Sequence, residues 1–240
     1  MRLDTLRRPL SIDSIRDGGA YAVDCAPPTQ TNLFLRVGLV DELFIKLPSE
    51  RGWDDYRTFL RFAHPHPLDV RPLEAAERFD NLPGTLARFP ALSSLDASDP
   101  EIGHYLAVHK LQYERIRNQT AVGIPLARFG ALRPHRRGFR PTIEPALFQE
   151  RVPGTTLWDM YDFDNLRIKP EWQPHLPIVS AQLSNFLDSG LLHHVDWNIQ
   201  NFVFDVQQER LFYVDLKPTI FVARSSNEHN LKGIREYFLV

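Results

Sequence analysis

The sequence has little cysteine and no long apolar run. Cys25 is the only cysteine in 240 residues, which excludes an intrachain disulfide and any site built on several thiolates, such as a four-cysteine zinc cluster. No stretch approaches the roughly 18 apolar residues of a membrane span, and the N-terminal segment MRLDTLRRPLSIDS lacks the apolar core of a signal peptide. We therefore expect a cytoplasmic protein without membrane contacts. A secreted effector, exported by a dedicated machine that reads this segment, fits the same residues.

An excess of charge of one sign is also absent. The 28 basic residues nearly balance the 30 acidic ones, so no overall field draws the chain to nucleic acid or to an anionic membrane, and we expect no nucleic-acid partner. Residues 133–141, RPHRRGFRP, hold four arginines that could grip a phosphate, an acidic protein or RNA. A solvated hairpin tip is the more common role of such a loop.

Composition and length are those of a globular chain. Hydrophobic residues make up 43% and charged residues 24%, which suits one large domain or two small lobes around a shared cleft. Internal repeats and low-complexity tracts are missing, and the 19 prolines divide the first two thirds into short elements. The sequence therefore predicts an irregular α+β architecture.

Hydrophobic periodicity and turn residues predict the order of the elements. Three strand-like runs form an expected antiparallel meander: Ala20–Cys25, Asn32–Val37 and Glu42–Leu47. Residues 48–98 are expected to be an insertion with helices near Asp54–Phe62 and Leu73–Phe79. The later expected elements are a long helix over Ser98–Asn118, strands over Pro125–Leu132 and Pro145–Val152, a helix-compatible stretch from Thr155, a helix over Pro177–Leu191, and strands over Phe202–Asp205 and Arg210–Asp215.

Polar residues cluster where the last predicted helix gives way to the last two strands. His194 and Asp196 are followed by Asn201, and Asp215 comes 14 residues after Asn201. Phosphoryl transfer needs such a set, because one carboxylate orients the nucleophile while an amide and a second carboxylate fix magnesium against the phosphates. The alternative is that His194 and Asp196 merely cap the end of the helix.

A lysine interrupts the third apolar strand. Lys46 lies in Leu43–Leu47, LFIKL, and a charge inside such a strand needs a partner. The alternative for Lys46 is an edge strand whose lysine prevents aggregation.

The segment Phe148–Gly154, FQERVPG, ends a strand in a turn-forming sequence. Together with the strand lysine, the long helix and the H-x-D-x-x-x-x-N segment with its late aspartate, it resembles the kinase-like phosphotransferase superfamily. Aminoglycoside phosphotransferase-like members are the most similar. The resemblance covers roughly residues 20–225. By itself, the segment Phe148–Gly154 is explained equally well as an ordinary turn after a strand.

The resemblance implies a two-lobed protein-kinase-like fold with ATP between the lobes. Residues 1–150 would form an antiparallel-sheet N-lobe with the insertion at 48–98, and residues 151–240 a reduced helical C-lobe. The implied catalytic residues are Asp196, Asn201 and Asp215; Asn201 and Asp215 would bind Mg²⁺. The implied ATP contacts are Lys46 to the α and β phosphates, Gln149 as gatekeeper, and main-chain groups of Glu150 and Val152 to adenine. The resemblance also implies a helix glutamate paired with Lys46: Glu101 and Glu114 of the long predicted helix are the candidates, and we prefer Glu114.

The expected function is transfer of the ATP γ-phosphate to a hydroxyl of a small molecule or a protein. The sequence departs from the family where a glycine-rich loop should cover the phosphates, since Ala26–Thr31 reads APPTQT. Only 25 residues follow Asp215, which predicts a minimal C-lobe. Two alternatives therefore stay open: a catalytically inactive pseudokinase that binds a protein partner, and a nucleotidyl transferase that adds AMP.

Histidines offer two other candidate metal sites. His193, His194 and Asp196 carry side chains that suit zinc, but adjacent residues rarely converge on one ion. His64 and His66 alternate with prolines in an extended segment without an evident third ligand.

Overall fold

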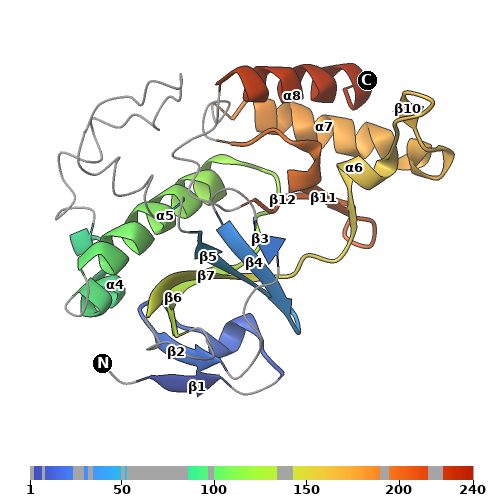
Figure 1. Cartoon of the computed structure of the whole chain (residues 1–240). Helices are drawn as coiled ribbons and strands as arrows, with labels where there is room; N and C mark the ends of the chain where they lie inside the picture. Colours follow the sequence, from blue (N-terminus) through green and yellow to red (C-terminus); the bar gives the residue numbers. More distant parts are fainter. Residues whose placement is uncertain are drawn as a thin grey trace. The chain divides into compact units, whose positions relative to one another are not determined.

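The computed structural model describes most of the chain (Figure 1). The described residues form two compact units, each with its own core. The first unit holds the described residues before Gln112 together with Leu126–Arg151, and the second holds Gln112–Pro125 and the described residues from Val152 onward. The described residues are 3–6, 9–23, 30–31, 35–49, 52, 86–96, 100–133, 143–189, 195–215 and 224–239. Most of the expected insertion at 48–98, with both of its helices, lies outside them.

The first unit is built on a curled seven-stranded sheet with the order β1-β2-β6-β7-β5-β4-β3 (Figure 1). Strands β3 to β7 pair antiparallel, whereas β2 runs parallel to both β1 and β6. The elements of this unit are β1 Asp4–Leu6, the 3-10 helix η1 Ile12–Ser14, β2 Ala20–Val23, β3 Gln30–Thr31, β4 Leu35–Val40, β5 Leu43–Pro48, α4 Pro90–Asp96, α5 Pro100–Gln119 (which continues into the second unit), β6 Ala127–Arg133 and β7 Glu144–Glu150.

The predicted three-strand meander is wrong for its first strand. β2 lies on the other side of the sheet from β4, beside β6. The turn before β2 fixes this position, because the Gly18 N–H donates to the Phe129 carbonyl and the Ala131 N–H donates to the Gly19 carbonyl, both at 2.8 Å. The Asp17 carboxylate adds a bond from the Phe129 N–H at 2.8 Å. Strand propensity carries no information on such a long-range parallel partner.

One face of the sheet carries an apolar core. Tyr21 meets Phe148 edge-on, with ring centroids 5.5 Å apart. Alternation along the strands places their neighbours on this face. The buried residues of this core are Leu10, Ile12, Ile15, Tyr21, Leu43, Ile45, Leu47, Leu132, Ala146 and Phe148.

The described part of the second unit contains short strands, the three α-helices α6, α7 and α8, and two 3-10 helices. A three-stranded sheet has the order β12-β11-β8, and β9 pairs with β10 in a hairpin. Its elements are β8 Thr155–Thr156, α6 Leu157–Met160, β9 Tyr161–Asp162, β10 Arg167–Ile168, the 3-10 helix η2 Pro170–His175, α7 Leu176–Leu187, the 3-10 helix η3 Ile199–Asn201, β11 Phe202–Asp205, β12 Arg210–Tyr213 and α8 Arg224–Tyr237.

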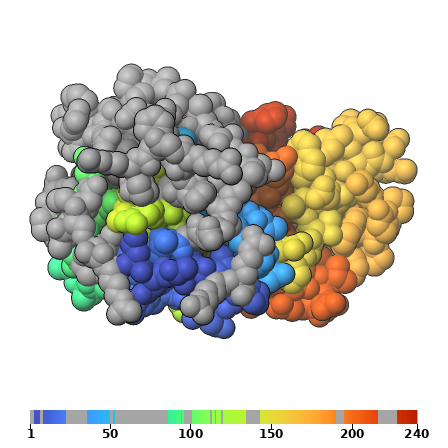
Figure 2. All heavy atoms as spheres, turned by 60° about the horizontal axis from the view of Figure 1, so that its bottom comes forward, coloured from blue at the N-terminus to red at the C-terminus, as the bar shows by residue number. Residues whose placement is uncertain are grey.

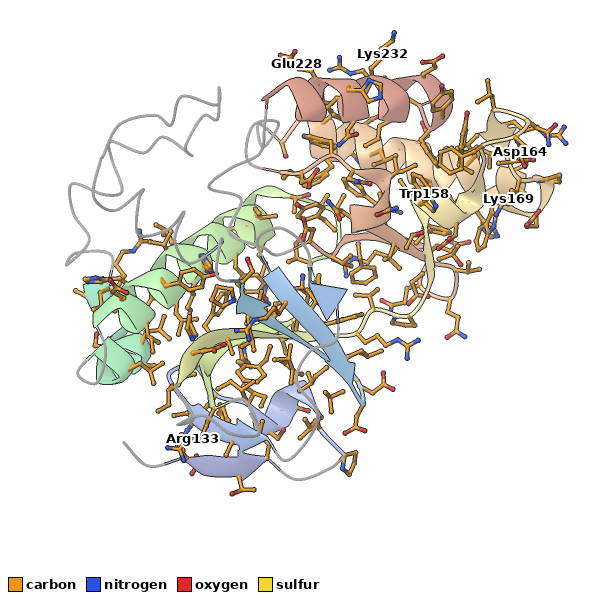
Figure 3. The ribbon with its side chains drawn as sticks, viewed as in Figure 1. Arg133, Trp158, Asp164, Lys169, Glu228 and Lys232 are labelled. Atoms are coloured by element: carbon orange, nitrogen blue, oxygen red, sulfur yellow. The ribbon has the colours of Figure 1, made fainter. Side chains whose placement is uncertain are left out.

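Two features of the second unit differ from the sequence expectation. The stretch from Thr155 forms only the short helix α6, capped by the Thr156 hydroxyl, before the β9–β10 hairpin. The yellow atoms of this region lie at the surface of the unit in Figure 2. The C-terminal helix α8 has no predicted counterpart. Ile234 of α8 and Phe238 directly after it are fully buried, while Glu228 and Lys232 of α8 point outward (Figure 3).

The chain joins the two units at Arg151–Val152 and also through α5, whose last turns belong to the second unit. Ile116 and Val122 are part of the second core. The Gly123 N–H donates to the Leu211 carbonyl at 2.8 Å, so the segment after α5 is bonded to β12. None of the described helices is long and apolar enough to cross a membrane.

A glycine at the start of the second unit has no room for a side chain. Gly154 has φ +137°, and an added Cβ would lie 2.4 Å from the Phe204 carbonyl oxygen. We expect Gly154→Ala to lower the free energy of unfolding by about 2 kcal/mol or more, because both the backbone conformation and the close approach require glycine. Denaturant unfolding measures the change.

Gly233 in α8 is the matched control for Gly154. A Cβ there would be 3.9 Å from its nearest neighbour, an ordinary contact. Gly233→Ala should raise stability by about 0.5–1 kcal/mol, since alanine is the better helix former. Equal effects of the two substitutions would contradict the steric argument.

A buried histidine makes stability depend on pH. His109 of α5 lies against Tyr105, with ring centroids 3.8 Å apart, and burial lowers its pKa from 6.5 to about 3. Between these values the unfolded chain binds more protons than the folded one, so the free energy of unfolding falls as the pH falls, by up to about 1.4 kcal/mol per pH unit. Unfolding curves at a series of pH values should show a shallower slope for His109→Leu. The exposed His229 provides the control, because His229→Gln should keep the wild-type slope.

Candidate functional site

The segment that carries Asp196 is anchored by its neighbours. Val195 and Trp197 are fully buried on either side of the partly exposed Asp196. The Trp197 ring stacks on Phe202, with centroids 5.7 Å apart at 25°, and lies 5.0 Å from Phe186. Asp196 is therefore held at the margin of a packed aromatic core.

Hydrogen bonds close this segment into a compact turn. The Asn198 N–H donates to the Asp196 carboxylate at 3.2 Å, and the Asn198 side chain accepts from the Gln200 N–H at 3.0 Å. The Asn201 N–H donates to the Asn198 carbonyl at 2.9 Å, which forms η3. The helix-cap interpretation of Asp196 is wrong, because α7 ends at Leu187 with Asp188 as its C-cap residue.

Three hydrogen bonds tie the segments of Asp196, Asn201 and Asp215 to one another. The Asn201 amide nitrogen donates to the Asp196 carbonyl at 3.1 Å. The Val214 N–H donates to the Asn201 carbonyl at 2.8 Å. The Asp196 N–H donates to the Tyr213 hydroxyl at 3.2 Å. The structure thus brings the predicted residues together at the start of β11 and the end of β12.

Sequence reasoning missed Tyr213, whose hydroxyl accepts the Asp196 N–H. The pKa of Tyr213 is raised well above the ordinary value, first by burial and then by the charges of Asp215 and Asp196. A signal was present, because Tyr213 and Asp215 are two residues apart at a strand end and alternation places them on one side.

Lys46 and Gln149 share one face of the first unit's sheet. Lys46 is opposite Leu147 and Phe44 is opposite Gln149 in the antiparallel register. Lys46 and Gln149 are both buried. The edge-strand interpretation of Lys46 is wrong, because β5 lies between β4 and β7.

Glu150 forms two hydrogen bonds with the main chain of Leu126. Its N–H donates to the Leu126 carbonyl at 2.9 Å, and its carboxylate accepts from the Leu126 N–H at 2.6 Å. The Glu150 N–H is therefore already used within the sheet, and the predicted main-chain contact with adenine stays a prediction. Val152, the other predicted main-chain contact, is partly buried and begins the second unit.

The two candidate partners of Lys46 fall in different units. Glu114, which we preferred, lies within Gln112–Pro125 of the second unit. Glu101 lies in the first turn of α5 and belongs to the same unit as Lys46. The preference for Glu114 stays a prediction.

The donors at the site suit magnesium. The Asn201 amide nitrogen is used on the Asp196 carbonyl, which leaves its amide oxygen for a cation. With the Asp215 carboxylate it provides the hard oxygen ligands that Mg²⁺ prefers, and ligand phosphates and water commonly complete its shell. Among the described residues, no group of three or more His, Cys, Asp or Glu side chains could hold a metal ion.

Several sequence candidates lie outside the described residues. They are Cys25 and most of Ala26–Thr31, the histidines His64, His66, His193 and His194, and most of the arginine loop at 133–141.

Comparisons with known proteins give no relative: no family model, no curated protein and no solved structure matches the chain. Any functional proposal therefore depends on the residues and their geometry.

The aromatic anchor next to Asp196 can be tested by stability. Trp197 is fully buried, whereas Trp158 on α6 is 42% exposed (Figure 3). Trp197→Ala should lower the free energy of unfolding by about 3–5 kcal/mol, through lost burial and the cavity left behind. Trp158→Ala should cost less than half as much in the same denaturant titration. Similar losses would mean that the Asp196 segment is not built on the core.

Proposed function

We propose that this protein is a Mg-ATP-dependent phosphotransferase that moves the γ-phosphate to a hydroxyl of a small molecule or a protein. The observation that carries the proposal is the set of hydrogen bonds that joins Asp196, Asn201 and the segment of Asp215. Phosphoryl transfer depends mainly on such positioning and on charge neutralisation.

Each residue has a role in this proposal. Asp196 orients the acceptor hydroxyl and takes its proton as the hydroxyl oxygen bonds to the γ-phosphorus and the bond to the bridging oxygen of the leaving ADP breaks. Asn201 and Asp215 hold Mg²⁺ through their oxygens. When bound, Mg-ATP supplies the phosphoryl group and the cation that offsets its charge.

The first unit would supply the nucleotide contacts. Lys46 would bind the α and β phosphates, and Gln149 would lie beside the base. Their strands β5 and β7 are direct neighbours, and both side chains are on one face. This supports the proposal, since residues that contact one nucleotide must lie on one side of the sheet. The finer fold that we propose is therefore kinase-like, with the first unit as N-lobe and the second as reduced C-lobe.

Calorimetric titration of Mg-ATP tests the proposal directly. Wild-type protein should bind ATP only when Mg²⁺ is present, and Asp215→Ala should weaken this binding at least about tenfold, because a charged ligand of the cation is lost. Asp164→Ala, which removes an exposed carboxylate from the β9–β10 hairpin (Figure 3), should bind like wild type. Circular dichroism checks that each variant is folded.

The outcomes separate the three candidate functions. Failure of the folded wild type to bind Mg-ATP would overturn the phosphotransferase and favour a pseudokinase. The intact mass of the protein is measured after incubation with Mg-ATP. An increase by the mass of a phosphoryl group supports phosphoryl transfer, whereas an increase by the mass of an adenylyl group indicates a nucleotidyl transferase.

A further inference from the structure

We propose that Tyr213 is a positioning residue whose hydroxyl fixes the spacing between Asp196 and Asp215. The inference rests on the phosphotransferase function proposed above and adds a residue that acts through the catalytic groups rather than on the substrate.

The Tyr213 side chain is held firmly in place. It is fully buried, and its ring lies 5.4 Å from Phe202 and 5.9 Å from Phe186 between centroids. Its N–H donates to the Gly123 carbonyl at 2.9 Å. Ring and backbone are thus both fixed, so the hydroxyl has a defined position.

The hydroxyl connects the two carboxylate-bearing segments. It accepts the Asp196 N–H at 3.2 Å, and it belongs to the strand that leads through Val214 to Asp215. A phenol hydroxyl oxygen accepts hydrogen bonds, so this bond fixes the Asp196 main chain without using the Asp196 carboxylate.

Of the three hydrogen bonds that join the segments of Asp196, Asn201 and Asp215, only the bond to the Tyr213 hydroxyl can be removed by a conservative substitution without changing another group of the site. The bond from Val214 to Asn201 joins main-chain groups, and the bond from Asn201 to Asp196 uses a proposed magnesium ligand. Tyr213→Phe keeps the ring contacts and deletes only the acceptor of the Asp196 N–H. Tyr161→Phe is the matched control, since Tyr161 is also buried in this unit and its ring packs on Phe163 and Tyr237.

The first measurement is amide hydrogen exchange, which requires no catalytic activity. Exchange at the Asp196 N–H should become about tenfold faster in Tyr213→Phe, as expected for a lost hydrogen bond of about 1.4 kcal/mol. The same amide should be unchanged in Tyr161→Phe. Unchanged exchange in Tyr213→Phe would overturn the proposal, whatever the protein does with ATP.

The second measurement separates positioning from simple structural support. With Mg-ATP as the probe, hydrolysis and self-phosphorylation are followed together, and kcat of Tyr213→Phe should fall about tenfold, because small misplacements of a catalytic group slow transfer strongly. The affinity for Mg-ATP should stay within about twofold of wild type, since Asn201 and Asp215 are retained. Equal losses in Tyr161→Phe, or unchanged turnover despite faster exchange, would overturn the positioning role. If the wild type does not bind Mg-ATP, the proposed function fails, while the exchange result still decides whether Tyr213 holds Asp196.

Discussion

The pairing of β11 with β12 is the interaction on which the candidate site depends. Four residue pairs, from Phe202–Tyr213 to Asp205–Arg210, align the two strands. This register places Asn201, just before β11, opposite Val214, just after β12, so their main chains are bonded. A slip by one residue would turn every side chain of the shifted strand to the other face and break both the aromatic core and the site.

The turn of the β11–β12 hairpin, at the end away from the site, is also held in place. The Gln182 side chain of α7 accepts the Leu211 N–H and donates to the Glu209 carbonyl, both at 2.8 Å. Asp205 accepts the N–H groups of Gln207 and Gln208 within the turn. The turn end of the hairpin is bonded to α7 and its other end packs on the core, so the site residues at that other end lie on a rigid support. Catalytic groups require such support to keep a productive geometry.

Local patterns in the sequence predicted the elements, but not their partners. The strand Phe202–Asp205 and the long helix α5 are confirmed, because their apolar periodicity and turn residues are local signals. The parallel partner of β2 and the last helix α8 were missed: parallel pairing is set by contacts far along the chain, and α8 gains its stability from a buried stripe against the core. Spacing alone marked Asp196, Asn201 and Asp215 as candidates. For Tyr213 the two-residue spacing from Asp215 was only a weak signal, since its place at the site depends on burial that the local sequence does not show.

Polar residues in buried positions help to decide between a ligand site and a plain scaffold. Lys46 and Gln149 are buried, and their chain neighbours Ile45, Leu47 and Phe148 are apolar and face the opposite side of the sheet. Burying an ammonium group and an amide on a sheet costs free energy unless their interactions offset it. Both residues lie on one face of adjacent strands, which is the arrangement that the proposed nucleotide contacts need.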